Sequence, residues 1–295
     1  MEIQGLILKC VAGVYELMTD DGVKNAYAAG KFRSKNVSPL PGDQVVLKLA
    51  ERAEENHLII DILPRKNELV RPPLANISSL LITMAVKKPN PDLKLADALV
   101  IFCRKNGIVP VVVVNKSDYD PAEAEKLAAQ FSSCGIKTVT VSKEDPTSAA
   151  RLREALGEGI TCFCGQSAVG KSTMTNLLLG RDQFETGGLS KKTERGKHTT
   201  RHSELVPIGP KQYLADTPGF SLLELPLLSP EDFLALYTEY EPYAASCRFA
   251  GCSHISEPDC AVKQALEQGK LSFERYERYC ELYAEVKDKW RKRYD

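Results

Sequence analysis

Two short polar motifs near the middle of the chain combine residue types and spacings that suit ligand chemistry. The later one, Gly165-Gln166-Ser167-Ala168-Val169-Gly170-Lys171-Ser172, fits the pattern GxxxxGK[ST]. Its glycines let the backbone wrap so that several N–H groups point at phosphate oxygens, and a helix from Lys171 onward adds its N-terminal dipole. We expect Lys171 to reach the β- and γ-phosphates and the Ser172 hydroxyl to coordinate Mg²⁺, with Thr173 beside them in the nucleotide site.

The earlier motif, Asn115-Lys116-Ser117-Asp118, suits a guanine base. The carboxylate of Asp118 can accept hydrogen bonds from guanine N1–H and from the exocyclic amine. Adenine lacks that pair of donors, so such a site rejects it by roughly 10⁴-fold. Asn115 would contact the base edge or tether the phosphate loop, and the stem of Lys116 would lie over the ring. At the next strand end, Val141-Ser142-Lys143 could supply a backbone N–H to guanine O6, and we name Ser142 as the site residue.

A third motif, Asp216-Thr217-Pro218-Gly219, follows the apolar residues 213–215 and fits the DxxG pattern. DxxG alone is common, but its distance behind a phosphate loop makes it informative. We expect Asp216 to hold Mg²⁺ through water and the Gly219 amide to sense the γ-phosphate.

The polar segment 187–201, between the phosphate loop and DxxG, has the composition of a switch loop or of a solvated linker. A threonine here would complete the Mg²⁺ shell when GTP is bound, and we favour Thr200 over Thr199. The position after DxxG, where many GTPases carry a water-orienting glutamine, is Phe220. His198 is therefore the candidate to orient or deprotonate water; the alternative is an exposed histidine that contacts RNA or nothing.

The order of these motifs is unusual. In an ordinary P-loop GTPase the phosphate loop comes first and the guanine element last, whereas here Asp118 precedes Gly165. The sequence therefore predicts a circularly permuted GTPase.

A cysteine and histidine cluster lies further along, with the spacing C-x4-C-x-H-x5-C. Its members are Cys247, Cys252, His254 and Cys260. Three thiolates and one imidazole suit a closed tetrahedral zinc site, which leaves no position for water and is therefore structural. The chain has nine cysteines, and the other six lie mainly in apolar patterns typical of core residues or ordinary thiols; two of them, in Cys162-Phe163-Cys164, belong to a buried strand and are not expected to bind metal.

The elements that must position these residues change along the chain. Residues 1–64 contain short alternating strands at 6–8, 14–17 and 44–47, with turns at 21–22 and 41–43. This pattern predicts a small β-barrel, either of the oligonucleotide-binding type or one that only packs on its neighbour. Residues 64–73 are expected to form a linker.

Residues 65–228 alternate between strand and helix patterns. We expect strands at 79–86, 109–114, 137–141 and 160–164 and helices at 94–105, 122–133, 148–156 and from 171 onward. This alternation predicts a parallel sheet with helices on both faces, which binds ligands at the carboxyl ends of its strands. Both nucleotide motifs fall at such ends.

Residues 229–295 are mainly helical around the zinc cluster, and 273–294 form one long helix with a basic end. Interleaved tyrosines and cations there suit an RNA-binding surface, although basic residues also complement the dipole of a helix C-terminus.

Bulk composition limits the possible functions. The chain has 39 Lys and Arg and 39 Asp and Glu, so nucleic-acid contact would need local basic patches, for which 31–35, 191–197 and 287–293 are candidates. No signal peptide is visible, and no stretch approaches the ~20 apolar residues of a membrane span. A reduced cytoplasmic compartment is the expectation.

Taken together, Asn115 to Asp118, the phosphate loop, Lys197 to Thr200, DxxG and the Cys₃His cluster resemble the RsgA (YjeQ/YloQ) family of bacterial ribosome-dependent GTPases. The resemblance covers essentially the whole chain. It implies an oligonucleotide-binding barrel, a permuted GTPase domain and a C-terminal zinc domain, with the family's switch histidine at His198 and its threonine at Thr200. Arg201 departs from the threonine that many members carry there, which leaves the choice of threonine open.

The resemblance also implies a function. GTP is hydrolysed to GDP and phosphate, with stimulation by the small ribosomal subunit, during late maturation of that subunit and in contact with its rRNA. Other assembly factors are possible partners, and we expect a monomer. The alternatives are a GTP-dependent switch that binds protein partners away from ribosomes and a nucleic-acid-binding zinc protein that keeps GTP as a structural ligand.

Overall fold

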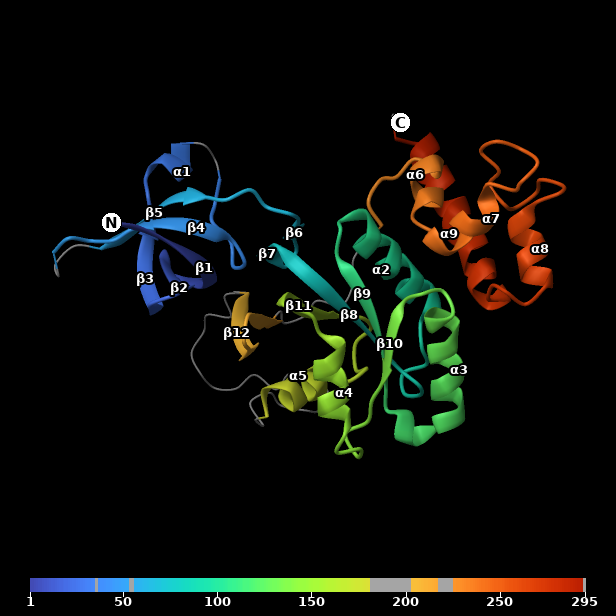
Figure 1. Ribbon diagram of the computed structural model, residues 1–295, viewed down its shortest axis with the longest axis horizontal. Helices are drawn as coiled ribbons and strands as arrows, with labels where there is room; N and C mark the ends of the chain where they lie inside the picture. Colours follow the sequence, from blue (N-terminus) through green and yellow to red (C-terminus); the bar gives the residue numbers. More distant parts are fainter. Residues whose placement is uncertain (35–36, 53–55, 181–202, 217–224, 294–295) are drawn as a thin grey trace. The chain divides into compact units, whose positions relative to one another are not determined.

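The computed structural model describes residues 1–34, 37–52, 56–180, 203–216 and 225–293 (Figure 1). These residues form two compact units. The first comprises Met1–Leu80, Leu156–Phe163 and Gly187–Phe220, and the second Leu81–Ala155, Cys164–Thr186 and Ser221–Asp295. The units follow contacts rather than chain order, so the boundaries at 1–64, 65–228 and 229–295 stay a prediction.

The first unit begins with a closed barrel whose strand order is β1-β2-β3-β5-β4. Its strands are β1 (Glu2–Val11), β2 (Val14–Thr19), β3 (Gly22–Ala28), β4 (Gln44–Lys48) and β5 (His57–Ile62), with the short helix α1 (Lys31–Ser34) after β3. Alternate residues point inward, and Ile7, Leu17 and Leu47 are fully buried in the barrel core. The predicted small β-barrel is confirmed.

The predicted turn at Gly42 precedes β4 and packs against Ala75 of β7 (Pro73–Ala75). Gly42 has a φ of +94°, and a Cβ there would lie 2.1 Å from the carbonyl oxygen of Ala75, so only glycine fits. The neighbouring Asp43 is fully buried and accepts two hydrogen bonds of 2.7 Å from Arg65. A buried carboxylate needs such a partner, and the pair fixes the chain as it leaves the barrel.

The segment 64–73, expected to be a linker, contains regular structure. Strands β6 (Glu68–Val70) and β7 (Pro73–Ala75) form an antiparallel two-stranded sheet. Pro73 is tolerated because it is the first residue of its strand. The side chain of Asn67 also pairs with the backbone of Ile77, through bonds of 2.9 and 2.8 Å. These local hydrogen bonds give the segment a regular structure that its polar composition did not predict.

A six-stranded sheet has the order β10-β9-β8-β11-β13-β12. Its strands are β8 (Ile77–Ala85), β9 (Val109–Asn115), β10 (Lys137–Thr140), β11 (Gly159–Cys164), β12 (Glu204–Gly209) and β13 (Gln212–Asp216). The pairs β10–β9 and β11–β13 are parallel, as expected. The edge strand β12 pairs with β13 in the antiparallel sense, because the short connection between them cannot make a parallel crossover.

Four helices of the second unit connect or follow these strands: α2 (Leu93–Lys105), α3 (Pro121–Ser132), α4 (Ser148–Ala155) and α5 (Lys171–Leu179). Right-handed crossovers put α2 and α3 on one face of the sheet and α4 and α5 on the other. Arg153 of α4 donates a hydrogen bond of 2.6 Å to the carbonyl of Leu178 in α5, and Figure 1 shows these two helices side by side.

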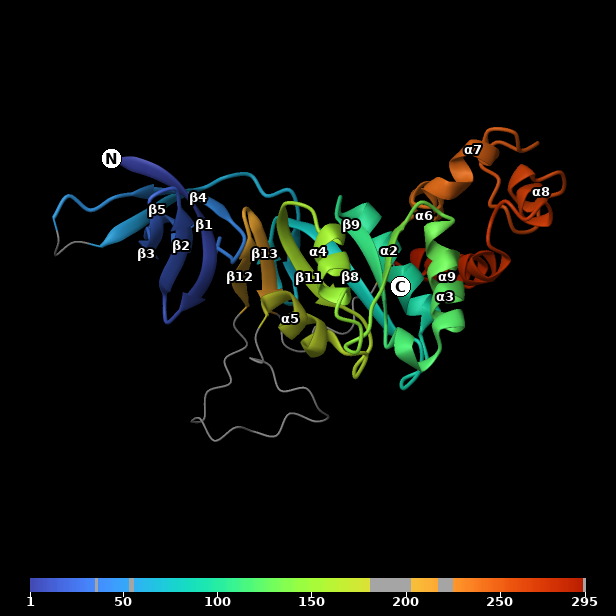
Figure 2. The ribbon, with the colours of Figure 1, turned by 60° about the horizontal axis from the view of Figure 1, so that its bottom comes forward.

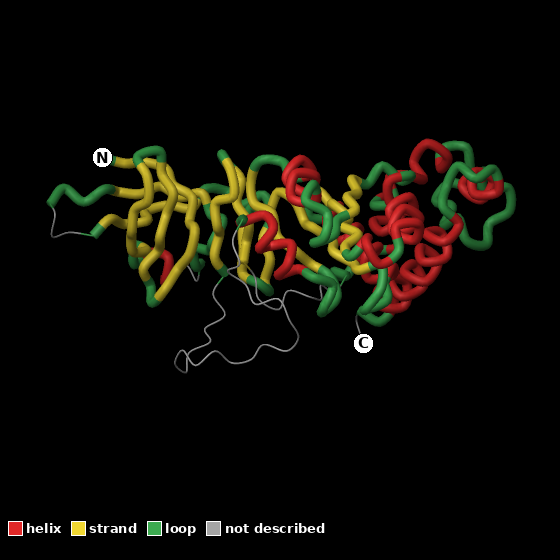
Figure 3. Tube along the Cα trace, turned by 90° about the horizontal axis from the view of Figure 1, so that it is seen from below, coloured by secondary structure: helices red, strands yellow, loops and turns green. Residues whose placement is uncertain are grey.

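The residues after 225 are helices and loops (Figure 3). They contain α6 (Pro230–Ala235), α7 (Glu241–Ala244), α8 (Ala261–Glu267) and α9 (Phe273–Arg291), with a 3₁₀ turn at Thr238–Tyr240. The rings of Phe233, Tyr237 and Tyr279 pack together, and Tyr279 is fully buried. The tyrosines of α9 that suggested an RNA surface therefore contribute at least partly to the core.

Helix α9 packs against α2 (Figure 2), and charged side chains are buried where the two helices meet. Arg278 donates to the fully buried carboxylate of Asp97, and Arg275 lies 3.2 Å from the other oxygen of that carboxylate. Glu239 pairs with Arg275 at 2.8 Å and with Arg104 at 2.7 Å. The cluster joins the helix that follows β8 to the C-terminal helices. No helix in the described ranges is long and apolar enough to cross a membrane.

Candidate functional site

The glycine-rich loop lies directly between β11 and α5. Gly165 follows the strand with a φ of +133°, and Gly170 precedes the helix with a φ of +97°. A Cβ on Gly165 would lie 2.1 Å from the Thr83 carbonyl oxygen, and one on Gly170 would lie 2.3 Å from Asn115 Nδ2. Neither position accepts a side chain, so both glycines are needed for the loop to pack beside β8 and β9.

Lys171 reaches back across this loop from the first turn of α5. Its Nζ donates hydrogen bonds of 2.7 Å to the Gly165 carbonyl and 2.6 Å to the Gln166 carbonyl. Burial lowers the pKa of Lys171 below the ordinary 10.5. The ammonium group is thus held over the concave side of the loop, where a phosphate chain would lie.

The guanine motif contacts the same loop. Asn115 is buried, and its Nδ2 donates a 2.8 Å hydrogen bond to the Val169 carbonyl, which is the tethering role among the two we considered. Lys116 donates to the carbonyls of Ala168, at 3.0 Å, and of Lys88. Burial also lowers the pKa of Lys116. The motif and the phosphate loop therefore form one hydrogen-bonded assembly, although they are far apart in the sequence.

The side chain of Asp118 is hydrogen-bonded by Ser142, which follows the end of strand β10. The Ser142 hydroxyl donates a 2.5 Å hydrogen bond to Asp118 Oδ1. The Ser142 backbone N–H, which we expected to serve guanine O6, donates instead to the hydroxyl of Ser148 at 3.0 Å. Ser148 is fully buried at the start of α4. Nothing in its sequence position signals this contact, and sequence reasoning missed it.

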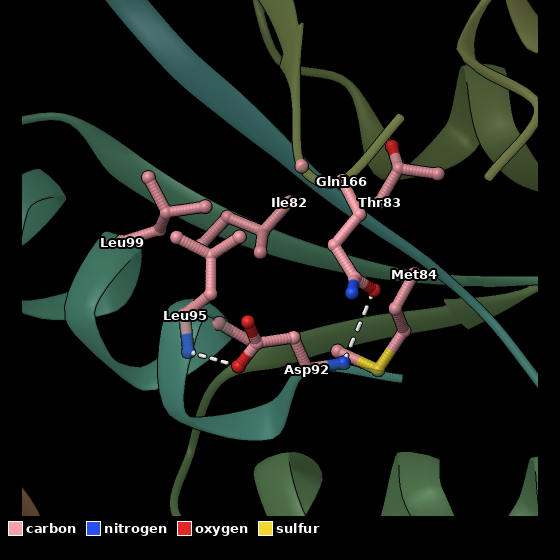
Figure 4. A pocket seen from close by; sticks show the side chains of 9 residues that line it. Ile82, Thr83, Met84, Asp92, Leu95, Leu99 and Gln166 are labelled. Carbon is pink, nitrogen blue, oxygen red and sulfur yellow. Dashed lines mark hydrogen bonds between the residues drawn. The ribbon is translucent and has the colours of Figure 1, made fainter. Parts of the chain in front are cut away.

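A small pocket lies beside the phosphate loop (Figure 4). Its cavity volume is about 10 Å³, and it lies between β8, α2 and Gln166. Gln166 Oε1 accepts a hydrogen bond of 3.1 Å from the Asp92 amide, and Asp92 Oδ1 caps α2 by accepting from Leu95 N at 2.9 Å. This cavity is far smaller than the roughly 300–1,000 Å³ of typical ligand pockets, so it has no room for a nucleotide.

The remaining nucleotide motifs are described only in part. Strand β13 ends at Asp216 and runs parallel to β11, with Ala215 opposite Cys162. The parallel register places the carboxyl ends of these two strands at the same edge of the sheet. The rest of the DxxG motif, which includes Gly219, lies outside the described residues. So do Phe220 and the candidate switch residues His198, Thr199 and Thr200.

The Cys₃His residues come together as the spacing predicts. The ligand atoms of Cys247, Cys252, His254 and Cys260 all lie within 4.8 Å of one another. Tetrahedral zinc, with bonds of about 2.3 Å to sulfur and 2.0 Å to nitrogen, requires about 3.8 Å between sulfurs and about 3.6 Å from sulfur to nitrogen. The Cys247–Cys260 sulfurs are 3.9 Å apart, and His254 Nδ1 lies 3.6 and 3.4 Å from them. The donor set fits zinc.

Neighbouring residues hold this ligand loop. The Tyr276 hydroxyl of α9 donates a 2.6 Å hydrogen bond to the His254 carbonyl. Glu257 accepts from the amide and hydroxyl of Ser253, at 2.8 and 2.7 Å, and from the Ile255 amide. Partial burial would raise the pKa of Glu257, but these hydrogen bonds outweigh it and lower the pKa to about 2. The loop is fixed by contacts that the ligand spacing does not reveal.

Comparison with known proteins identifies the family. Residues 62–226 match the RsgA GTPase family, and residues 4–55 match the RsgA N-terminal domain. The chain belongs to the RsgA GTPase family. It is therefore a GTP-hydrolysing enzyme, and the predicted family resemblance is confirmed.

Individual relatives agree along the whole chain. A protein of Ruminiclostridium cellulolyticum named "Small ribosomal subunit biogenesis GTPase RsgA" is 41% identical, covering 96% of this chain and 94% of the relative. One of the same name from Caldanaerobacter subterraneus is 39% identical, covering 99% and 98%.

Two solved structures of RsgA type are also similar. YjeQ from Thermotoga maritima is 27% identical with a TM-score of 0.80, covering 97% of this chain and 99% of YjeQ. YloQ, described as a circularly permuted GTPase, is 28% identical with a TM-score of 0.80, covering 98% and 96%. The matching fold covers nearly the whole chain, and the reversed motif order of this chain agrees with the description of YloQ as circularly permuted.

Proposed function

We propose that this GTPase acts in late biogenesis of the small ribosomal subunit, binds its rRNA, and is stimulated by that subunit to hydrolyse GTP. The carrying observation is full-length similarity to relatives whose names state small ribosomal subunit biogenesis. A cytoplasmic monomer suits this role, and other assembly factors are further candidate partners.

The guanine base is bound in this proposal by Asp118, whose carboxylate accepts from N1–H and the exocyclic amine. Because the Ser142 amide is engaged by Ser148, the next amide, that of Lys143, is the donor for guanine O6. The Lys143 amide makes no hydrogen bond to other described residues. Ser142 contributes through its hydroxyl, which orients Asp118. Lys116 lies along the base, and Asn115 holds the phosphate loop against it.

The triphosphate is bound by the loop from Gly165 to Thr173. The phosphates are faced by the N-terminus of α5 and by the backbone N–H groups of this loop, and Lys171 neutralises their charge. The loop residues that supply these N–H groups are Gly165, Gln166, Ser167, Ala168, Val169 and Gly170. Ser172, Thr200 and, through water, Asp216 would hold Mg²⁺, and the Gly219 amide would sense the γ-phosphate. Magnesium supplies neutralisation of the charge that develops on the phosphate oxygens.

His198 is proposed to orient or deprotonate the attacking water, because Phe220 occupies the position of the usual glutamine. His198→Ala should leave GTP affinity unchanged and lower the turnover measured with saturating small subunits. Asn is a useful second substitution, since its amide can still orient water but cannot take a proton at neutral pH. Unchanged stimulated turnover in His198→Ala would exclude this role.

Zinc is proposed as a structural ion held by Cys247, Cys252, His254 and Cys260. Four protein donors leave no coordination position for a substrate. For rRNA contact, the exposed Lys31 of the barrel and the basic end of α9 are candidates, together with the basic segment 191–197 outside the described residues.

The alternative is a GTP-dependent switch that binds protein partners away from ribosomes. Cosedimentation with purified small subunits separates the two functions. The proposed function predicts association with a non-hydrolysable GTP analogue and weaker association with GDP, and added salt should weaken it further. Equal absence of binding with either nucleotide would favour the alternative.

A further inference from the structure

The contacts behind the guanine motif point to a positioning residue that the nucleotide motifs do not include. We propose that Ser148 sets guanine specificity indirectly, by fixing Ser142 so that its hydroxyl orients the Asp118 carboxylate. The inference rests on the proposed guanine site at Asp118, and it adds a residue that touches neither the base nor the phosphates.

The chain of contacts is short and mostly buried. Ser148 Oγ accepts from the Ser142 amide at 3.0 Å, and Ser142 Oγ donates to Asp118 Oδ1 at 2.5 Å. Ser148 is fully buried and Ser142 is 2% exposed. The Ser142 hydroxyl also accepts from the Glu144 amide at 3.1 Å, so its proton is directed at Asp118. One rotamer of Ser142 satisfies all of these bonds.

Ser148 is itself fixed by the turn that starts α4. Its amide donates to the Asp145 carbonyl at 3.0 Å, and Arg151 donates to its hydroxyl at 3.3 Å. Hydrogen bonds from Thr147, with a smaller contribution from the charge of Arg151, lower the pKa of Asp145, so this carboxylate is an acceptor at the centre of the turn. The position of Ser148 is therefore set by α4 and not by the nucleotide.

Removal of the Ser148 hydroxyl leaves the Ser142 amide buried without its acceptor. A buried N–H group without an acceptor lowers the stability of the folded protein. We therefore expect the turn to shift so that the Ser142 amide meets another acceptor or water. Any such movement turns the Ser142 hydroxyl away from Asp118. The carboxylate then loses the orientation in which its two oxygens meet both donors on guanine, and the bond to the exocyclic amine weakens.

Inosine triphosphate tests this directly because inosine lacks the exocyclic amine. The measured quantity is the ratio of the dissociation constants for inosine and guanosine triphosphate, obtained by competition against a fluorescent GDP analogue. Ser148→Ala should lower this ratio about five-fold, the effect of weakening without abolishing one hydrogen bond to a charged acceptor. Ser148→Cys, with a weaker acceptor of similar size, should lower it less and guards against loss of folding, which thermal melting monitors.

Thr138→Ala is the matched control, because the Thr138 hydroxyl on β10 donates to the Ile136 carbonyl and lies outside the turn that holds Ser148. It should leave the ratio unchanged. A double-mutant cycle with Ser142→Ala identifies the route of the effect: if Ser148 acts through Ser142, adding Ser148→Ala to Ser142→Ala lowers the ratio no further. Additive effects, or equal weakening of both nucleotides in Ser148→Ala, would overturn the inference.

Asp118→Asn distinguishes failure of the guanine site from failure of the inference. The amide of asparagine can donate to the 2-oxo group of xanthine, so this variant should exchange preference for guanosine triphosphate for preference for xanthosine triphosphate. If Asp118→Asn exchanges the preference while Ser148→Ala keeps the wild-type ratio, the guanine site at Asp118 is supported and only the role of Ser148 is excluded. If Asp118→Asn does not exchange the preference, both the guanine site and the role of Ser148 are excluded.

Discussion

At the scale of single residues, the nucleotide site depends on backbone groups that side chains position. Gly165 and Gly170 admit the close approach of β8 and of Asn115, and Asn115 in turn holds the Val169 carbonyl. The cationic groups over the loop are partly desolvated, which favours their neutral forms until an anion arrives. Lys171 and Lys116 show this effect as lowered pKa values.

This desolvation predicts proton uptake on GTP binding at alkaline pH. The pKa of Lys171 lies below 10.5 in the free protein, and the negative phosphates raise it again. Binding therefore takes up protons between the two pKa values, and GTP affinity falls as the pH rises through the lower one. Calorimetry at about pH 9, in buffers of different ionisation enthalpy, measures the uptake.

Lys171→Arg is the control for this prediction, because arginine stays charged at that pH and should take up fewer protons even if its affinity is lower. Lys116→Arg separates the smaller contribution of Lys116. Identical binding heats in all buffers for the wild-type protein would contradict the prediction.

The sequence predicted the residue types at this site better than their contacts. The patterns around Asp118 and Lys171 follow from what guanine and phosphate require, so they are visible without a structure. The engagement of the Ser142 amide by Ser148 is not, because it depends on how α4 packs behind the strand end. Hydrogen bonds between residues outside a motif leave no pattern in a single sequence.

At the scale of elements, helix α2 contacts both the phosphate loop and helix α9. The amide of its N-cap residue Asp92 donates to Gln166 of the phosphate loop, and Asp97 within the helix pairs with Arg275 and Arg278 of α9. Burial raises the pKa of Asp97, and the two guanidinium groups oppose that rise. The buried carboxylate therefore depends on α9 for its compensation.

Removal of one guanidinium should destabilise the protein substantially. Arg278→Ala leaves Asp97 partly uncompensated in a buried position, which we expect to lower the free energy of unfolding by about 3 kcal/mol. Arg291→Ala on the same helix removes an exposed pair with Asp288 and should change the free energy of unfolding little. Urea unfolding of both variants measures the difference. Equal effects would mean that the buried pair contributes no more than a surface one.

The ligand loop offers a second prediction at this scale. Glu257 has a pKa of about 2, below the ordinary 4.5, so its carboxylate stabilises the loop above about pH 4.5 and loses this contribution as the pH falls through 2. Glu257→Gln should therefore release zinc several-fold faster at neutral pH, measured by transfer to a chelating dye. Glu267→Gln, on the exposed side of α8, should release zinc at the wild-type rate. Equal rates in both variants would contradict a supporting role for Glu257.

Element patterns in the sequence predicted the strands and helices of the central sheet closely. Buried strands such as β9 and amphipathic helices such as α2 have unambiguous periodicity. Two features escaped prediction. The polar segment 64–73 acquires structure through Asn67 and Asn76, and the antiparallel edge strand β12 follows a segment without periodicity.

At the scale of the whole molecule, the reversed motif order determines what each end of the GTPase sequence is joined to. The guanine element follows the barrel and the strand β8, whereas Asp216 ends the last strand before the chain continues to the helices with the Cys₃His residues. The switch motif and the metal-binding region are thus consecutive in the sequence. In the proposed function, both flanking regions contact the ribosome, and the nucleotide controls the association.

The most direct test of this account is phosphate release from GTP by the purified protein, with and without purified small ribosomal subunits. The account predicts slow release by the protein alone, because Phe220 cannot orient water, and a large increase when small subunits are added. Large subunits provide the control and should give no comparable increase. Release that small subunits leave unchanged, from a protein that binds GTP normally, would contradict the proposed function.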